Sequence, residues 1–207
     1  MSPCSIDYTF LNTIKGFMHD QEVARLYNVA LEASSMGPLL EIGSYCGRSA
    51  VVIGQACKEN DAILFSIDHH RGSEEQQPGE EYFDPDLYDP SVARVNTFPF
   101  FRNTLAQAQL EDTVVPIVAS SAVVGRMWAT PLAMVFIDGG HSFEAAHTDL
   151  TIWSPHLMTG GYLVIHDIFF DPEAGGQPPR QIYESAIATG SYDVLEMTKT
   201  LGVLRRI

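Results

Sequence analysis

Ionisable side chains follow two apolar segments in the last third of the chain. Asp138 ends the run AMVFID and is followed by two glycines and His141, while His166 and Asp167 end the run YLVIHD. If both runs are neighbouring parallel strands, Asp138 and Asp167 meet above the sheet, with His166 beside them and His141 facing the same hollow. Two carboxylates and an imidazole suit a divalent cation, Mg²⁺ or Mn²⁺ ahead of Zn²⁺. The alternative is that the carboxylates cap helices and that His141 bonds to main chain.

A second candidate site is a glycine turn. The segment LLEIGSYCGRS, residues 39–49, predicts a short buried strand, a tight turn and the start of a helix. Gly43 and Gly47 have no Cβ, so main chain there can approach a bound molecule, and the N–H groups of the following helix favour polar or anionic ligand atoms. Their GxxxG spacing differs from the GxGxxG of dinucleotide sites, which argues against a nicotinamide cofactor and leaves another nucleoside-like ligand open. Glu41 adds a carboxylate near the turn.

Polar residues also follow two other expected strands. The run FSID ends at Asp68, and an acidic residue there can accept hydrogen bonds from both hydroxyls of a ribose. His69 follows at once, and both a ligand role and a basic patch paired with the acidic loop beyond it stay open. Ser120 and Ser121 follow the third strand and offer hydroxyl or main-chain contacts to a ligand.

An α/β sheet is needed to position these residues. Expected strands are 39–42, 63–67, 114–118, 133–137 and 162–165, and expected helices are 49–57, 143–153 and 180–188. This alternation predicts crossover units and a parallel sheet covered on both faces. Segments 192–196 and 201–205 predict an antiparallel hairpin at the end. Residues 8–34 have helical spacing, with Asp20 as N-cap, and predict a structural helix over the start of the sheet.

Composition restricts the class of partner. The chain has 207 residues and a formal net charge of −14, which disfavours nucleic acid and anionic membrane surfaces as partners. Its three cysteines form no CxxC pair, which suits a reducing compartment. The first residues lack a basic region followed by an apolar run, and no segment reaches the length of a membrane span. We therefore expect a cytoplasmic protein with a small-molecule partner.

Two long connections have the composition of active-site loops. Residues 72–99 are rich in acids and prolines, and a connection of this length is often a functional lid. A solvated acidic loop or an oligomer contact is the alternative. Residues 169–179 follow Asp167 directly and are expected to shape the substrate site. The aromatic residues of the first loop, which could cover a flat substrate, are Tyr82, Phe83, Tyr88 and Phe98.

These motifs resemble a known family. The segment EIGSYCGRS resembles the first motif of class I methyltransferases that use S-adenosylmethionine (SAM). The DGGH of residues 138–141 and the HD of residues 166–167 resemble the small-molecule O-methyltransferase branch that includes macrolide sugar and cephalosporin-type enzymes. The resemblance implies a Rossmann-like, mostly parallel sheet with a C-terminal antiparallel hairpin. We expect a single SAM-dependent methyltransferase domain over 1–207, with an N-terminal helical segment 8–34 and an acidic insertion 72–99.

The resemblance also implies roles for individual residues. His141 would be the catalytic base, and Asp138, His166 and Asp167 would hold the metal. Two departures are visible, because the family often has an acid that contacts adenine where Ser120 stands and usually has Glu where His166 stands. The expected SAM-binding residues are Glu41, Gly43, Ser44, Gly47, Ser49, Asp68, His69, Ser120, Ser121 and Asp138.

The sequence thus predicts SAM-dependent methylation of a hydroxyl on a small molecule, assisted by a divalent cation. A nicotinamide-dependent oxidoreductase would use the same type of sheet, although the GxGxxG pattern is missing. A catalytically silent SAM-binding protein also stays open, because the residues at 120 and 166 depart from the family pattern. Assembly into a homo-oligomer is a further expectation that the sequence leaves open.

Overall fold

A single seven-stranded sheet organises the chain. The computed structural model describes residues 6–140 and 142–207. The strand order is β5-β2-β1-β6-β7-β9-β8. The first five strands are parallel, and β9 pairs antiparallel with both of its neighbours, β7 and β8. This confirms the expected Rossmann-like sheet that ends in an antiparallel hairpin. The strands are β1 Leu39–Ile42, β2 Leu64–Asp68, β5 Val114–Val118, β6 Leu132–Ile137, β7 Leu157–Ile165, β8 Tyr192–Val194 and β9 Gly202–Arg206.

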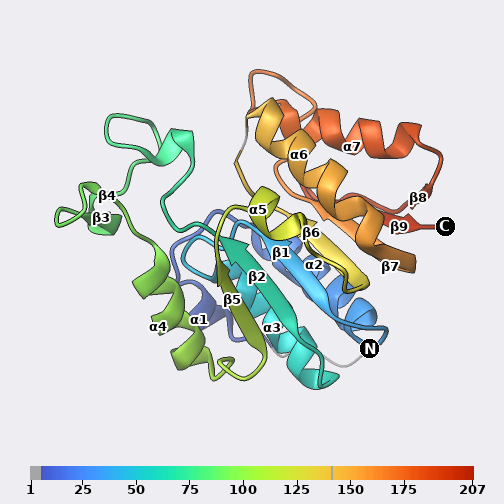
Figure 1. Ribbon diagram of the computed structural model, residues 1–207, viewed down its shortest axis with the longest axis horizontal. Coiled ribbons are helices and arrows are strands. Elements are labelled where there is room, and N and C mark those ends of the chain that lie inside the picture. The colour runs from blue at the N-terminus through green and yellow to red at the C-terminus, as the bar shows by residue number, and fades with distance from the viewer. Residues whose placement is uncertain (1–5, 141) are drawn as a thin grey trace.

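Helices cover both faces of this sheet, as Figure 1 shows. One layer contains α1 Tyr8–Leu11, α2 Asp20–Ser34, α3 Arg48–Glu59 and α4 Phe98–Ala108. The other contains α5 Ser121–Gly125, α6 Phe143–Trp153 and α7 Pro178–Ala188. Each layer packs its apolar stripe on one face of the sheet, so the central strands are buried on both sides, whereas the edge strands β5 and β8 are partly exposed.

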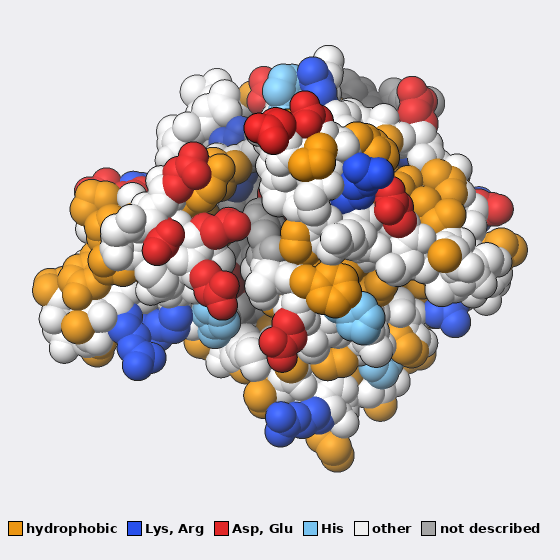
Figure 2. Space-filling view, turned by 90° about the horizontal axis from the view of Figure 1, so that it is seen from above, with side chains coloured by type: hydrophobic (Ala, Val, Ile, Leu, Met, Phe, Trp, Pro, Cys, Tyr) orange, Lys and Arg blue, Asp and Glu red, His pale blue; other side chains and the backbone are white. Residues whose placement is uncertain are grey.

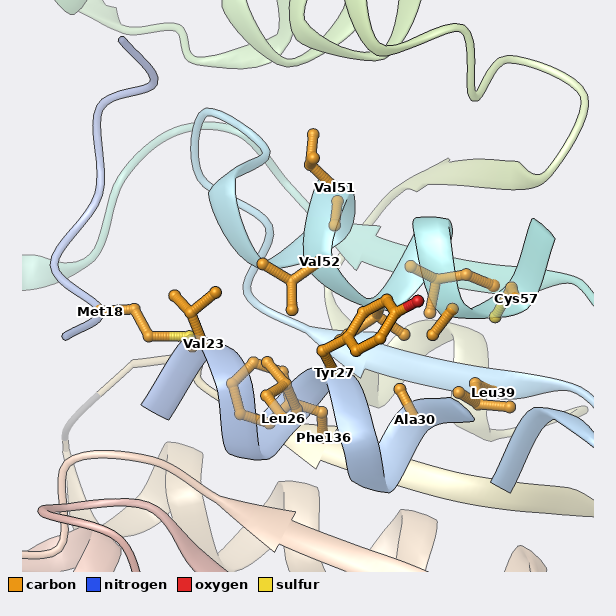
Figure 3. Packing of buried hydrophobic residues seen from close by; sticks show 14 of the residues in the cluster. Met18, Val23, Leu26, Tyr27, Ala30, Leu39, Val51, Val52, Cys57 and Phe136 are labelled. Carbon is orange, nitrogen blue, oxygen red and sulfur yellow. The ribbon is translucent and has the colours of Figure 1, made fainter. Parts of the chain in front are cut away.

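The buried residues alternate between the two layers along each strand. Leu39 of β1 and its partner Met134 of β6 pack in the layer of α2 and α3, while Leu40 and Val135 pack under α6 and α7. Figure 3 shows side chains of α2 and α3 meeting over the sheet, with Phe136 of β6 fully buried beneath Leu26. This alternation fixes the register, because a one-residue shift would exchange the two faces.

The expected segments and the observed elements differ at several boundaries. β7 begins at Leu157, earlier than expected, and the β6–β7 pairing is irregular between Leu132 and Met134. α4 was not predicted, although Pro99 in its first turn is a usual helix-start signal. Phe143, the first residue of α6, is 54% exposed and stacks on His147.

The N-terminal segment is not one continuous helix. α1 ends at Leu11, and α2 starts at Asp20 with His19, rather than Asp20, as its N-cap. The His19 ring accepts from the N–H of Gln21, and the Glu22 carboxylate accepts from the N–H of His19, which completes a capping box. The intervening residues are therefore free to run toward the carboxyl edge of the sheet.

The acidic insertion has structure of its own. It contains the 3₁₀ turns η1 Glu74–Gln76 and η2 Pro85–Leu87 and a two-stranded ribbon of β3 Tyr88–Asp89 and β4 Arg94–Val95. Its last residues already belong to α4. In Figure 1 it projects beyond the sheet on the left, next to the ends of β2 and β5. Within the described ranges, no helix is long and apolar enough to cross a membrane.

The connectivity places a topological switch point at the carboxyl ends of β1 and β6. From β1 the chain proceeds to β2 and β5 on one side, and then to β6 and β7 on the other. The connections after β1 and β6 diverge there, which opens a crevice outside the strand ends. The residues expected to bind ligands lie on either side of this crevice.

Candidate active site

One cavity of about 910 Å³ lies at the carboxyl ends of β2, β1, β6 and β7. Its volume is in the range of small-molecule and cofactor sites. Figure 2 is seen from this side and shows Asp and Glu side chains around a hollow. Its walls come from the glycine turn, the loops after β2, β5, β6 and β7, the acidic insertion and the segment before α2.

The turn after β1 is held by main-chain packing. Gly43 has φ +90°, and a Cβ at this position would lie 2.1 Å from the carbonyl oxygen of Asp138. Gly47 has φ +95° and is the N-cap of α3. The close approach at Gly43 is to the end of β6, and the expected approach to a bound molecule stays a prediction. Glycine is required here to bring the two sides of the switch point together.

Asp68, at the end of β2, bonds to the same turn. Its Oδ2 accepts from the N–H groups of Ser44 and Tyr45 at 3.0 and 2.9 Å, and its Oδ1 accepts from the N–H of His70 at 2.7 Å. The side chain is 15% exposed and lines the cavity. Asp68 thus fixes the turn and also lines the cavity.

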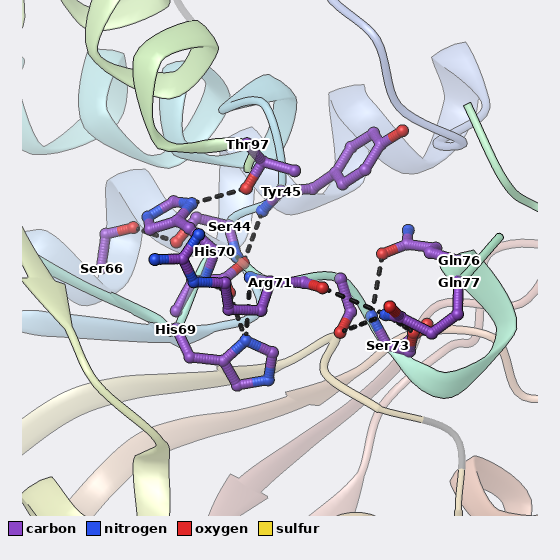
Figure 4. Close-up of polar contacts among 12 residues, drawn as sticks. Ser44, Tyr45, Ser66, His69, His70, Arg71, Ser73, Gln76, Gln77 and Thr97 are labelled. Atoms are coloured by element: carbon purple, nitrogen blue, oxygen red, sulfur yellow. Dashed lines mark hydrogen bonds and ion pairs between the residues drawn. The ribbon is translucent and has the colours of Figure 1, made fainter. Parts of the chain in front are cut away.

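The two histidines that follow Asp68 lie in different environments, a difference that the sequence did not indicate. His69 lies at the cavity rim with its side chain 51% exposed. His70 is buried, and its Nδ1 lies 2.7 Å from the Thr97 hydroxyl, as Figure 4 shows. His70 therefore ties the loop to the start of α4, and burial lowers its pKa against the attraction of Asp68.

Glu41 lies beneath the turn and is fully buried. Its carboxyl accepts from Ser66 Oγ at 2.6 Å and from Ser49 Oγ at 2.9 Å, and Ser44 Oγ lies 2.6 Å from Ser66 Oγ. Burial raises the pKa of Glu41 to about 8, despite these two hydrogen bonds. Glu41 is absent from the cavity wall, whereas Ser44 and Ser49 belong to it. Its position is that of a support beneath the turn.

The wall after β5 contains an acid that the sequence analysis missed. Ser120 and Ser121 line the cavity, and Ser121 donates a hydrogen bond to Asp149 of α6. Asp149 is 4% exposed, and burial raises its pKa to about 6 against the effect of that bond. The sequence did contain an indication of this buried acid, because Asp149 lies between Ala146 and Trp153 on the buried face of the predicted helix 143–153.

Asp138, His166 and Asp167 converge at the other side of the cavity. His166 Nδ1 lies 3.1 Å from Asp138 Oδ1 and 3.5 Å from Asp167 Oδ1. One potential ligand atom from each residue lies within 4.8 Å of the other two. Asp167 has φ +58°, an uncommon backbone conformation that aspartate tolerates better than most residues. His141, the expected base, lies outside the described residues.

His166 also has a partner that the sequence did not indicate. Its Nε2 lies 3.2 Å from Glu22 Oε2 in α2. Burial would lower the pKa of His166, but Asp138, Glu22 and Asp167 raise it to about 11. Burial would raise the pKa of Glu22, but bonds from His166 and Thr200 hold it at about 2. This cluster stabilises positive charge at the imidazole.

The cavity mouth joins the N-terminal segment to the acidic insertion. Lys15 forms ion pairs with Asp84 and Asp86. The rings of Phe17 and Tyr82 meet edge-on with their centroids 5.7 Å apart, and both side chains line the cavity. The expectation of a purely structural N-terminal helix is therefore incomplete. Of the insertion's four aromatic residues, only Tyr82 contributes to this wall.

The fold and the cavity define an α/β protein with a cavity of ligand size at the switch point of its sheet. A family model described as a methyltransferase domain matches residues 40–168, more than half of the chain. The chain belongs to this methyltransferase family.

Solved O-methyltransferases share the fold at low sequence identity. NovP is 17% identical with a TM-score of 0.66, over 90% of this chain and 79% of NovP. TomG from Streptomyces achromogenes, involved in tomaymycin synthesis and solved with SAM, is 14% identical with a TM-score of 0.67, over 99% of this chain and 92% of TomG. An O-methyltransferase from Bacillus cereus in complex with SAH is 12% identical with a TM-score of 0.63, over 98% and 93% of the two chains.

The buried Glu41 predicts a specific pH dependence of stability. Its pKa is about 8 in the folded protein, against 4.5 for an unperturbed glutamate. Between these pH values the folded state keeps a proton that the unfolded state releases, so this group makes stability fall as pH rises from about 4.5 to 8. Each pKa unit corresponds to about 1.4 kcal/mol. Glu41→Gln should abolish this contribution, because the amide does not titrate.

Urea unfolding at several pH values would measure the effect as a difference between wild type and Glu41→Gln. The variant should gain stability relative to wild type as pH rises through this window. Glu196→Gln, at an exposed position, is the matched control and should show no such trend. A constant difference between wild type and Glu41→Gln across the window would contradict the assignment.

Proposed function

We propose that this protein transfers a methyl group from SAM to a hydroxyl of a small molecule. The observation that carries the proposal is the convergence of the glycine turn, Asp68 and the Asp138–His166–Asp167 cluster on one cavity in a methyltransferase-family chain. Support for the chemistry comes from NovP, TomG and the Bacillus cereus protein, which are described as O-methyltransferases. TomG was solved with SAM.

The wall of the cavity offers the groups that a nucleoside sulfonium requires. SAM supplies a methyl group that its positive sulfur has already activated. Asp68 is placed to accept from ribose hydroxyls, and the Ser44 and Gly43 turn provides close main chain. Ser120, Ser121 and Asp149 provide polar contacts for the base. The main catalytic task of the chain is then to align an oxygen with that methyl group, and such alignment is worth about 7–11 kcal/mol.

We propose Asp138, His166 and Asp167 as the ligands of a divalent cation. The donor set fits, because an imidazole nitrogen and two carboxylates face the cavity within coordinating reach of a common point. A bound Mg²⁺ or Mn²⁺ would act as a Lewis acid that lowers the pKa of the substrate hydroxyl. His141 stays the proposed base on its sequence motif alone.

The charge around the cavity favours a neutral or cationic substrate. Lys15 pairs with Asp84 and Asp86, and both terminal nitrogens of Arg48 donate to the segment before α2. Neither is therefore available to pair with a substrate anion. Outside the proposed cation ligands, the acidic residues among the cavity-lining side chains are Asp68, Glu74, Glu75, Glu144 and Asp149.

The insertion is proposed as a lid over the substrate. Its residues 73–76 and Tyr82 line the cavity, and its contacts with Lys15 and Phe17 close the mouth from the opposite side. A flat ring would pack against these aromatic side chains. An oligomer contact through the same insertion is the second role that the sequence leaves open.

The first prediction from the proposed function concerns SAM binding. Asp68→Ala should raise the SAM dissociation constant by about tenfold or more, because it removes the ribose acceptor and releases the N–H groups of Ser44 and Tyr45. Calorimetry on the folded variant would measure it, with exposed Asp193→Ala as the control. NAD(H) should give no binding heat with wild type. Unchanged SAM affinity in Asp68→Ala would contradict the role of Asp68 as the ribose acceptor.

The second prediction concerns the cation. EDTA should suppress turnover, and Mg²⁺ or Mn²⁺ should restore it, while SAM binding persists. Asp167→Asn should weaken the response to metal, and asparagine tolerates the left-handed backbone at this position. Asp171→Asn, in the exposed loop that follows, is the control. Full activity after exhaustive chelation would remove the cation from the proposal.

The third prediction concerns substrate charge. Catechol, dopamine and 3,4-dihydroxybenzoate share one ring and differ in charge at neutral pH. The anion should have the lowest kcat/KM, by about tenfold or more, since one charge about 6 Å from a carboxylate interacts by roughly 2–3 kcal/mol near a protein surface. The ratio should shrink at high salt. A preference for the anion would contradict the proposed charge selection.

A further inference from the structure

Glu22 is a buried carboxylate outside the groups proposed to bind SAM, the cation or the substrate. It lies in the first turn of α2, only 2% exposed, and it is 144 positions from His166 in the sequence. Its position in the capping box accounts for one hydrogen bond, which it accepts from the N–H of His19 at 3.0 Å. The remaining bonds extend across the molecule and have no role in starting the helix.

All the hydrogen-bond partners of Glu22 can act as donors. Oε1 accepts from the N–H and the hydroxyl of Thr200, at 2.8 and 2.7 Å. Oε2 accepts from the His19 N–H at 3.0 Å and lies 3.2 Å from His166 Nε2. A carboxylate can satisfy donors on both oxygens, whereas a glutamine would turn its own NH₂ toward at least one of them. The position is therefore specific for the charged residue.

This arrangement fixes the orientation of the His166 ring. Because Nε2 donates to Glu22, Nδ1 is the nitrogen directed at Asp138 and Asp167 on the cavity side. Histidines that ligate metals commonly donate their other nitrogen to a carboxylate, which sets the tautomer and the ring orientation. Glu22 has this relation to His166, and Thr200, in the turn before β9, holds Glu22 in place.

We propose that Glu22 is a positioning residue of the cation centre, holding His166 so that Nδ1 is its ligand atom. The inference rests on the proposed cation site and goes beyond it, because it assigns a role to a residue of the N-terminal helix. It also explains how histidine can replace the Glu that usually stands at position 166 in the resembling branch. The carboxylate lost from the ligand set is supplied from behind the imidazole.

The test is Mn²⁺ affinity of the full-length protein, measured by calorimetry with Mn²⁺ alone and by electron paramagnetic resonance. Glu22→Gln should weaken Mn²⁺ binding by about 10- to 100-fold, the usual effect of losing such a partner. SAM affinity should change by less than about twofold. Asp20→Asn, at an exposed neighbouring acid in the first turn of α2, is the matched control and should keep wild-type Mn²⁺ affinity.

A milder pair of variants covers the case in which Glu22→Gln does not fold. Thr200→Val removes one donor to Glu22 and leaves the main-chain donor, so it should weaken Mn²⁺ binding less than Glu22→Gln does. Thr200→Ser keeps the hydroxyl and should retain wild-type Mn²⁺ affinity. A helix-capping role alone would not produce this order.

Three results would be decisive. A folded Glu22→Gln, or failing that Thr200→Val, with wild-type Mn²⁺ affinity would overturn the inference. Wild type that binds SAM but no Mn²⁺ would also overturn it and leave SAM-dependent methyl transfer standing. Weakened Mn²⁺ binding in Glu22→Gln together with no SAM binding by wild type would support the inference and refute the proposed cofactor.

Discussion

Buried carboxylates at the carboxyl edge of the sheet need donors or protons, and the shape of the site depends on how each is satisfied. Asp68 accepts from three main-chain N–H groups, which fixes the glycine turn against β2. Glu22 accepts from the His19 N–H just before α2 and from Thr200 in the turn before β9, and it contacts His166 just after β7. Glu41 is held by two serine hydroxyls, and its pKa of about 8 favours the neutral form at pH 7. The same interactions that offset burial therefore connect segments distant in sequence.

These connections place the proposed SAM-binding turn and the proposed cation site on opposite sides of the switch point. Gly43 packs against the main chain of Asp138, so the turn that faces the proposed nucleoside and the strand end that faces the proposed cation are in direct contact. A larger residue at Gly43 would push them apart. Substitutions there would disturb fold and site together, which makes Asp68 a better probe of ligand binding than the glycine.

Local periodicity was enough to predict a parallel sheet, and the family resemblance implied its Rossmann-like type. The meeting of Asp138, His166 and Asp167 followed on the condition that their two strands are neighbours, which the structure confirms. These follow from strand alternation and from the rule that parallel strands end on one edge. Glu22 and Asp149 could not be assigned in the same way, because their roles depend on long-range contacts with His166 and Ser121. An acid on the buried face of a helix was the visible signal in both cases. The non-helical residues before α2 depend similarly on distant partners, including Arg48 and the insertion.

At His166, a carboxylate outside the proposed ligand set contributes charge to the cluster from behind the ring. A glutamate there would add a third carboxylate directly to the proposed ligand set, whereas His166 adds a neutral or cationic ring with Glu22 behind it. Three carboxylates therefore surround the imidazole, and that of Glu22 lies in the core rather than at the cavity. A carboxylate in that position needs several donors, and Thr200 and His19 supply them. The N-terminal helix and the C-terminal hairpin thereby become part of the same site.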